Sequence, residues 1–581
     1  MEFSSFFSDR EVILQLCKER VKLAKQRHEA MFLFNIDPRN PKPKLEKPLH
    51  WDEGIALDIF PPRRAWKSFR ARRSERDRSS IDVNLNSLIK AVLTLRKENP
   101  TAPWVQRLNE VVKRIRERAL SDQQFAFGAP TVLAEEKEKG SGVFRPLSVF
   151  RLEDKLIERQ TASYLRRTLD YLFLPSCLAF RCSRNRVPPP TIHDALERIV
   201  SFRGKPQSAP VFVAECDIKG FFDCVPHDLA RRSVEALIRE YVSTAAPAAQ
   251  HIDQRAWTIF VAYLNAYCFQ RNVKLGAEPQ LKKNRRGACF KWPEAELLQL
   301  HGSLGEIGVP QGGALSCLIA NAVLHAVDKE LEGIASRYPG EFLYLRYCDD
   351  MILLAKKGDV CLEGLEAYCS RVEELGFLIH PCKDAGTDKS FYSGKSHNPY
   401  PWGGSQLEFP WIQFVGYQVR HDGMVRVRLK SLKKQRRRIT EVADEVLATL
   451  NPGRKRVGEV PALSPTVRRT AQQIKHRLRQ RLISISVGRR KLGQDLSEIM
   501  PMCWCHGFRG LKGRSIIESS LKMLDRHRER QIMRVARRLN EHELSLPKAT
   551  DRSPVEALNF YGMPFSYCGQ FNSRESRVRK P

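Results

Sequence analysis

The sequence has no run of about 18 apolar residues, the length that a membrane-spanning helix needs, so we expect no membrane span. Residues 1–15 lack a basic segment followed by an apolar one, and we expect no secretory signal. The 15 cysteines are odd in number and have no regular spacing. This pattern favours free thiols in a reducing cytoplasm over a disulfide framework. We therefore expect a cytoplasmic protein.

Acidic residues are scarce relative to basic ones. The 581 residues include 98 Lys and Arg against 66 Asp and Glu, a formal net charge of +32. Half of this excess lies in residues 420–491, which hold 21 basic and 5 acidic residues, a net of +16. Residues 63–78 and 282–286 are also basic. Because the signs are not mixed, an anion-binding surface is favoured over a solvated helix face, and nucleic acid is the usual anion. The basic residues have no apolar helical face beside them, so we expect no membrane partner.

Apolar periodicity predicts both helices and strands, and therefore an α/β (α+β) fold. Helical patterns cover residues 81–120 with a break at Asn99-Pro100, and residues 152–174, 227–242, 314–335, 361–376 and those beyond 430. Short apolar runs typical of strands occupy residues 211–217, 343–347, 351–355, 411–419 and 424–429. The charged, glycine-ended segment 135–142 is typical of a hairpin tip.

Two adjacent acids, Asp349 and Asp350, lie between two of the apolar runs, and Asp217 ends another. Neighbouring carboxylates repel each other, and a divalent cation removes that repulsion. If the strands lie side by side, Asp217 and Asp349 can face one point. Such a carboxylate set suits a pair of Mg²⁺ ions about 3.5–4 Å apart, as used in phosphoryl displacement.

The chain resembles the reverse transcriptase family in six ordered blocks between residues 130 and 420. They are FRPLSVFRLEDKLIERQ (144–160), ECDIKGFFDCVPHDL (215–229), GVPQGGALSCLIAN (308–321), YCDD (347–350), GFLIHPCKD (376–384) and FVGYQV (414–419). One departure is Cys317, where the family usually has proline. The resemblance implies a right-hand polymerase with fingers, a palm whose antiparallel sheet carries the YxDD hairpin, and a helical thumb.

The resemblance also implies metal-binding roles. Asp217 and Asp349 would bind both Mg²⁺ ions, the backbone carbonyl of Ile218 would complete one coordination shell, and Asp350 would assist. Phe222 matches the steric gate that selects dNTPs over rNTPs. Its neighbour Phe221 is expected to pack in the core, because adjacent residues on an extended chain face opposite ways.

Other positions match the family's nucleotide contacts. Gln311 would lie against the incoming nucleotide, and Gly312-Gly313 would let the backbone approach the template. Arg145 and Lys139 would hold the triphosphate, with Lys137 as an alternative to Lys139. Lys383 matches the lysine that protonates pyrophosphate, although simple charge balance is an equal alternative.

We expect an N-terminal extension at 1–80, fingers and palm at 81–424, a basic thumb at 425–500 and an extension of unknown role at 501–581. Arg436, Arg437 and Arg438 are the expected RNA-binding residues of the thumb. Cys503, Cys505, His506 and Cys568 have a poor spacing for Zn²⁺, and free thiols are expected there.

These features predict an RNA-directed DNA polymerase that uses Mg²⁺ and dNTPs to copy an RNA template into DNA. The chain looks most like stand-alone bacterial antiphage reverse transcriptases, with a structured noncoding RNA as template. Two alternatives remain: a group II intron maturase, and a non-catalytic RNA-binding scaffold. The intact carboxylates argue against the scaffold. The primer and the oligomeric state are left open.

Overall fold

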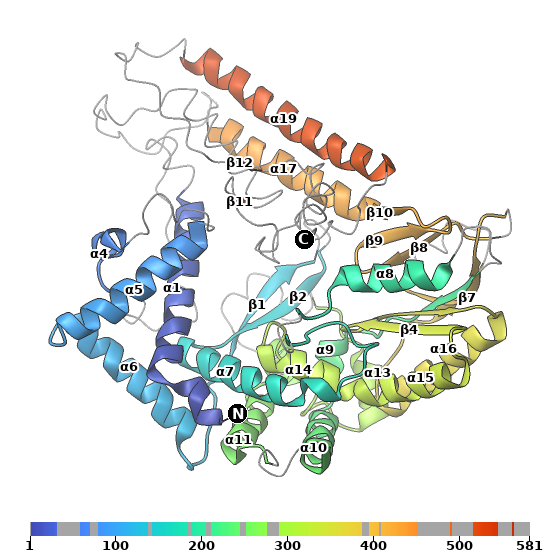
Figure 1. Ribbon diagram of the computed structural model, residues 1–581, viewed down its shortest axis with the longest axis horizontal. Coiled ribbons are helices and arrows are strands. Elements are labelled where there is room, and N and C mark those ends of the chain that lie inside the picture. The colour runs from blue at the N-terminus through green and yellow to red at the C-terminus, as the bar shows by residue number, and fades with distance from the viewer. Residues whose placement is uncertain are drawn as a thin grey trace, which may run out of the picture.

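The computed structural model describes residues 2–31, 58–69, 80–137, 142–183, 188–204, 211–244, 251–275, 290–385, 394–405, 408–449, 489–490, 515–543 and 561–562. The fold is mixed α/β with antiparallel sheets, as predicted. Helices from the first 120 residues lie at one end, the largest sheet lies at the other, and a long helix pair crosses above (Figure 1). No helix that the structure describes is both long and apolar enough to cross a membrane.

The N-terminal region is helical. It contains η1 (Phe3–Phe7), α1 (Asp9–Ala30), α4 (Arg63–Ser68), α5 (Ser80–Glu98) and α6 (Pro103–Leu120). The predicted break at Asn99-Pro100 is confirmed, since α5 ends before it and α6 begins after it. Buried side chains of η1 and α1, such as Phe7 and Leu16, belong to the same apolar cluster as residues of the following domain.

A hairpin follows the helical region. Strands β1 (Thr131–Glu136) and β2 (Phe144–Val149) pair antiparallel along their whole length, which confirms the predicted hairpin. The chain then forms α7 (Leu152–Leu169), η3 (Asp170–Leu172) and α8 (Ile192–Arg203). Ser148 of β2 donates its backbone N–H to the carbonyl of Gln311 at 3.1 Å. The hairpin is thereby joined to a loop that lies 163 positions later in the chain.

The five-stranded sheet has the order β4-β5-β3-β7-β6. Its strands are β3 (Val211–Glu215), β4 (Phe342–Tyr347), β5 (Asp350–Ala355), β6 (Cys382–Lys383) and β7 (Ser396–Trp402). All neighbours pair antiparallel except β6 and β7, which pair parallel. Strand β7 was not predicted, because Pro399 and Pro401 interrupt its apolar pattern.

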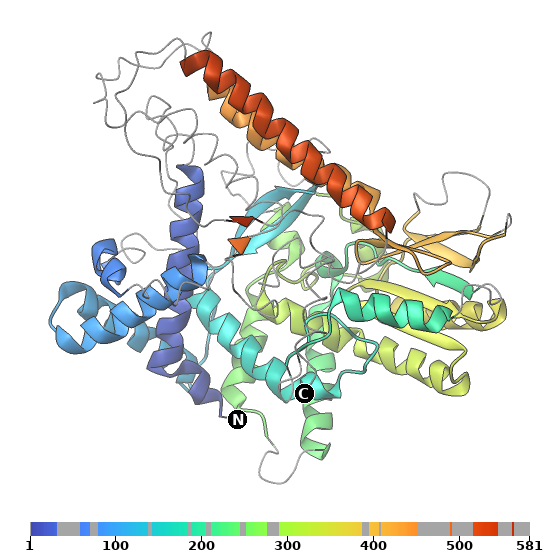
Figure 2. The same cartoon turned by 45° about the horizontal axis from the view of Figure 1, so that its top comes forward.

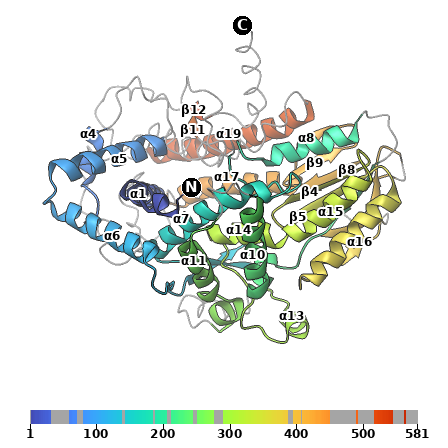
Figure 3. The ribbon, with the colours of Figure 1, turned by 60° about the horizontal axis from the view of Figure 1, so that its bottom comes forward.

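Helices also form between β3 and β6 in the chain. They are α9 (Phe221–Cys224), α10 (His227–Thr244), α11 (Gln254–Asn265), η5 (Gln270–Lys274), α13 (Glu294–His301), α14 (Ala314–Val323), α15 (His325–Arg337) and α16 (Gly358–Glu374). Helices α15 and α16 lie together beside the sheet (Figure 3). The single helix predicted for 314–335 is wrong in one respect, because it is interrupted at Leu324, where ψ is 0°.

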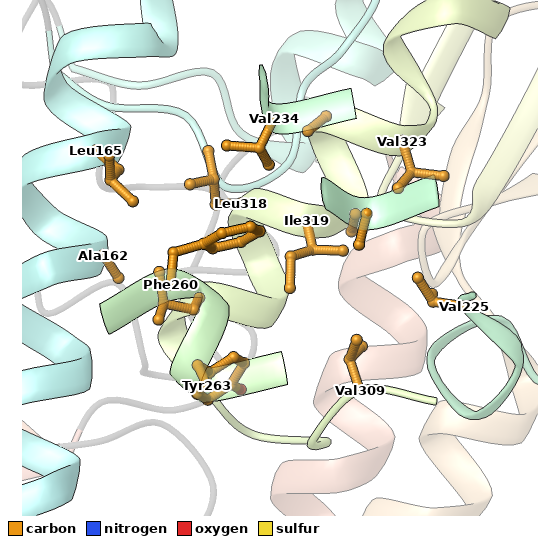
Figure 4. Close-up of a cluster of buried hydrophobic side chains, with 14 of the residues drawn as sticks. Ala162, Leu165, Val225, Val234, Phe260, Tyr263, Val309, Leu318, Ile319 and Val323 are labelled. Atoms are coloured by element: carbon orange, nitrogen blue, oxygen red, sulfur yellow. The ribbon is translucent and has the colours of Figure 1, made fainter. Parts of the chain in front are cut away.

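Helices α7, α10, α11 and α14 enclose an apolar core (Figure 4). Phe260, Tyr263, Leu318 and Ile319 are each at most 1% exposed. Burying side chains of this kind stabilises the fold by roughly 1.5–3 kcal/mol each. The loop 308–313 adjoins this core: Val309 is buried in the same cluster, and Ser316 Oγ, 2.8 Å from the hydroxyl oxygen of Tyr263, donates to the carbonyl of Pro310 at 2.7 Å.

A second sheet contains β8 (Trp411–Phe414), β9 (Tyr417–Arg420) and β10 (Val425–Val427), in the order β10-β9-β8. One strand was predicted for 411–419, but a turn at Val415-Gly416 divides it in two. Helix α17 (Leu429–Thr449) follows, and α19 (Ser515–Glu543) packs along it (Figure 2). A short ladder joins β11 (Arg489–Arg490) to β12 (Tyr561–Gly562).

Candidate active site

Pairing between β3 and β5 brings the predicted carboxylates together. Ala214 of β3 lies opposite Leu353 of β5 in an antiparallel register. Continuing this register places Asp217, three residues beyond Ala214, beside the end of β5 where Asp350 begins the strand. The prediction that the two acidic segments lie side by side in one sheet is confirmed. Strand β3 ends at Glu215, two residues before Asp217.

The turn between β4 and β5 is tight. Tyr347 lies opposite Asp350, so only Cys348 and Asp349 form the turn. Cys348 adopts φ 63°, a left-handed conformation that is uncommon for residues other than glycine. The buried Arg346 donates from Nη1 to the carbonyl of Cys348 at 2.9 Å. This bond supports the strained turn from below and so positions the Asp349 carboxylate.

The carboxylates of the hairpin repel each other, and the charges of Arg145 and Arg428 offset this only in part. Burial raises the pKa of Asp349, and the nearby charge of Asp217 raises it further. The side chain of Asp350 is exposed to solvent, but surrounding protein atoms displace part of the water that would hydrate its carboxylate. This loss of hydration, with the charges of Asp349 and Asp217, raises the pKa of Asp350 to about 6. A cation at this place would lower both pKa values.

Asp217 is bonded to a cation from the same chain. Lys395, at the start of the unpredicted strand β7, places its Nζ 2.7 Å from Oδ2 of Asp217 and 3.0 Å from Nε2 of His380. The Asp217 side chain is 22% exposed. Lys395 was missed because its surrounding sequence contains no recognisable motif. Its ammonium group shows that this carboxylate favours positive charge at close range.

These residues fit Mg²⁺. Three carboxylates act on one another electrostatically, and one of them already attracts an ammonium group. Carboxylate oxygens are the ligands that Mg²⁺ prefers. Ile218 is 2% exposed and forms an antiparallel bridge with Ile379, which fixes the backbone whose carbonyl was predicted as a ligand. The role of that carbonyl stays a prediction.

Gln311 contacts an acid that the sequence did not single out. Its Nε2 donates to Oδ1 of Asp223 at 2.7 Å. Burial raises the pKa of Asp223 to about 7, although the charges of Lys137 and Arg145 act against this. Asp223 could have been noticed as the acid six residues after Asp217 in the same block.

The two glycines after Gln311 are needed by the fold itself. Gly312 has φ +95°, and a Cβ on Gly313 would lie 1.9 Å from the hydroxyl oxygen of Tyr263. A side chain at either position would therefore displace the loop. Their predicted approach to a template remains a prediction.

Arg145 lies on β2 with its side chain exposed toward the site. Its positive charge acts on Asp349, Asp223 and Lys137. Loss of water and the charge of Arg145 lower the pKa of Lys137, while Asp223 and Asp217 act against this shift. Lys137 is thus electrostatically coupled to the carboxylates. Lys139 lies outside the described residues.

Phe221 packs in the core as expected, but for another reason, and the steric-gate role of Phe222 stays a prediction. Phe221 is 2% exposed and packs on Phe377 with ring centroids 5.1 Å apart, whereas Phe222 is only partly buried. The argument from an extended chain is wrong, because both residues lie in the short helix α9. Packing, not strand alternation, separates the two rings.

Two predicted basic groups lie away from these contacts. Lys383 is exposed on β6, at the edge of the sheet, and its register partner is His397. Arg436, Arg437 and Arg438 are exposed on α17. The predicted basic segment 282–286, residues 450–488 of the thumb, and Cys503, Cys505, His506 and Cys568 lie outside the described residues.

One region of the chain matches a known protein family. Residues 285–397 match the family described as "Reverse transcriptase (RNA-dependent DNA polymerase)". This match includes Gln311, Asp349 and Asp350, and it begins after Asp217. Residues 285–397 are therefore similar to a reverse transcriptase domain, within a chain whose fold is mixed α/β.

A curated relative from Schizosaccharomyces pombe, "Uncharacterized 91 kDa protein in cob intron", is 27% identical over 202 residues. The matched part is 35% of this chain and 19% of that protein. Among solved structures, apo telomerase from Candida tropicalis has a TM-score of 0.34 at 11% identity, covering 92% of this chain and 83% of that one. Telomerase from Candida albicans with a fragment of telomeric RNA has a TM-score of 0.32 at 13% identity, covering 80% and 71%. Similarity at these TM-scores carries no argument about function.

Proposed function

We propose that this chain, which matches a reverse transcriptase family model over residues 285–397, is an RNA-directed DNA polymerase with Asp217, Asp349 and Asp350 as its metal-binding carboxylates. One observation carries the proposal: β3 and β5 are neighbours in the sheet, so the acid after β3 meets the acids of the β4–β5 turn. In this proposal residues 81–424 form fingers and palm, residues 425–500 the thumb, and residues 1–80 and 501–581 extensions. The proposed setting is the cytoplasm.

The residues of the site divide the work of nucleotidyl transfer. Bound Mg²⁺ would favour loss of the proton from the primer 3′-hydroxyl and neutralise the charge on the phosphates. Arg145 and Lys137 would bind the triphosphate by charge, and a planar guanidinium suits phosphate geometry. Phe222 would lie under the sugar, and Gln311, held by Asp223, would orient the nucleotide. The protein positions and neutralises, and no residue bonds covalently to substrate.

Lys395 competes with metal for Asp217 in this proposal. Metal binding would release its ammonium group from the carboxylate, toward His380 and the incoming phosphates. Lys395 is thus a second candidate, beside Lys383, for the lysine that donates a proton to pyrophosphate. Separate Lys383→Met and Lys395→Met variants decide between them, because only loss of the proton donor removes the alkaline limb of the pH profile of kcat.

The test of the activity is extension of a DNA primer on an RNA template with dNTPs and Mg²⁺. Wild type should extend the primer, and Asp349→Asn should not. Asp228→Asn is the matched control, since Asp228 is exposed on α10. Equal extension by wild type and Asp349→Asn would contradict the proposal.

For the template, we favour a dedicated structured noncoding RNA in bacterial antiphage defence. The support is charge: 21 basic residues in 420–491, with more at 63–78 and 282–286, exceed what a short template–primer duplex needs. Three separate basic segments suit a folded RNA bound across the enzyme.

A group II intron maturase is the second candidate, favoured by a different observation. The matched curated relative is named as a protein in a cob intron. Sequencing the RNA that copurifies with the protein separates the candidates. One small structured RNA supports the first, and intron RNA supports the second.

A further inference from the structure

Three cysteines converge beside the candidate active site. Cys216 follows β3, Cys369 lies on α16 and Cys382 lies on β6. Their Sγ atoms all lie within 4.8 Å of one another, and among the described residues they are the one group of three or more metal-ligating side chains this close. None of the three is in a disulfide. We call these residues the cysteine trio.

We propose that the cysteine trio binds one Zn²⁺ ion through three thiolates. Thiolate sulfur is the ligand that favours Zn²⁺ over the hard Mg²⁺. Two sulfurs bound to one tetrahedral Zn²⁺ at about 2.3 Å lie about 3.8 Å apart, which agrees with the observed clustering. A disulfide would require two of the sulfurs to approach to about 2.05 Å and would leave the third unused.

The three cysteines differ in burial, and the two more exposed ones would allow an ion to reach the site. Cys216 is 2% exposed, whereas Cys369 and Cys382 are partly exposed. The fourth coordination position would fall to water. The register partner of Cys382 is Ser396, and the ring of the next residue, His397, places its Nδ1 2.8 Å from Oε2 of Glu215.

The position of the cysteine trio indicates what a bound ion would do for the structure. Cys216 directly precedes Asp217, and the other two ligands come from α16 and from the edge strand β6. Backbone hydrogen bonds already join residues 217–219 to residues 378–380, and the ion would add a link from these segments to α16. It would thereby hold Asp217 in position against the repulsion of Asp349 and Asp350. Spacings of 152 and 12 intervening residues resemble no zinc motif, which explains why the sequence did not reveal the site.

The test is the zinc content of the full chain, purified under reducing conditions and measured by elemental mass spectrometry. Wild type should hold one Zn²⁺ per chain that survives dialysis against EDTA at low concentration. Cys369→Ala and Cys382→Ala should lose it. Cys361→Ala is the matched control, because Cys361 lies on the same helix, is fully buried and is outside the trio. Asp217→Asn should keep its zinc, which separates this site from the magnesium site and from the polymerase activity.

A second measurement needs no variant. Wild type stripped of zinc and loaded with Co²⁺ should show intense thiolate-to-cobalt charge-transfer absorption and the visible bands of a tetrahedral site. Zinc that persists in both Cys369→Ala and Cys382→Ala would assign the metal to other residues and overturn the proposal. Reduced wild-type protein that takes up neither Zn²⁺ nor Co²⁺, or a disulfide within the trio after non-reducing purification, would also overturn it.

Discussion

Arg346 and Asp328 form an ion pair in which both side chains are fully buried, directly beneath the candidate catalytic turn. Nη2 of Arg346 lies 2.5 Å from Oδ2 of Asp328, and Nε lies 2.7 Å from Oδ1. Tyr344 donates its hydroxyl to the same carboxylate at 2.9 Å. Because Arg346 also holds the Cys348 carbonyl, the pair connects α15 to the turn that carries Asp349.

Removing one partner of this ion pair should destabilise the protein strongly. Asp328→Asn keeps the shape but leaves a buried guanidinium without its counter-charge, at a cost of about 3–5 kcal/mol. Glu363→Gln, which breaks the exposed Arg337–Glu363 pair, should cost less than about 1 kcal/mol. Thermal denaturation of both variants checks this. Equal melting temperatures would mean that the buried pair is not structurally important.

Neutralising Asp349 should abolish nucleotide incorporation without loss of folding. Removing one metal-ligand charge should cost several orders of magnitude in rate. Since burial and Asp217 disfavour the charge on Asp349, Asp349→Asn should melt no lower than wild type. Single-turnover primer extension and a thermal melt on the same preparation are the measurements. A lower melting temperature with retained activity would assign Asp349 a structural role.

Opening space at Phe222 should change sugar selection. Phe222→Ala should raise rNTP incorporation relative to dNTP, because the ring would no longer exclude a 2′-hydroxyl. Phe222→Tyr, which keeps the ring, should retain dNTP preference. Primer extension with each nucleotide set gives the ratio. An unchanged ratio in Phe222→Ala would leave Phe222 as a packing residue.

The buried carboxyl of Asp223 should make stability depend on pH. Its pKa rises on folding from 3.8 to about 7. Below pH 4 both folded and unfolded states hold the proton, so there is no penalty. As the pH rises toward 7, the unfolded state releases the proton first. The free energy of unfolding then falls by about 1.4 kcal/mol per pH unit.

Asp223→Asn removes this titration while an amide oxygen can still accept from Gln311. The melting temperature of the variant minus that of wild type should therefore be near zero at pH 4 and should increase up to pH 7.5. Asp228→Asn, on an exposed surface, should show no such increase. A difference that is constant with pH would mean that Asp223 stays ionised in the folded protein.

Charge reversal on α17 should release bound RNA. Arg436→Glu, Arg437→Glu and Arg438→Glu together should abolish copurification of the RNA and synthesis on it. The matched control reverses Lys329, Arg337 and Lys357, which are exposed on the palm. Equal recovery of RNA from both triple variants would contradict the proposal of a dedicated RNA template. A random sample of cellular transcripts bound to wild type would contradict it as well.

Much of the site could be predicted from sequence alone. Asp349 and Asp350 lie between two apolar runs, so a tight turn at this place follows from local chemistry. The glycines of PQGG indicate a loop of unusual backbone conformation, and φ +95° at Gly312 bears this out. The basic excess and the order of the six blocks likewise needed no coordinates.

Tertiary structure decided what lies around those acids. Lys395 reaches Asp217 only because β7, whose prolines hide it in the sequence, pairs with β3. The pKa of Asp223 is raised because the folded chain buries its carboxyl, although the hydrogen bond from Gln311, 88 residues later, acts against this. The cysteine trio exists only where the end of β3, α16 and β6 meet. Contacts between residues far apart in the chain depend on strand order and helix packing, which no local pattern specifies.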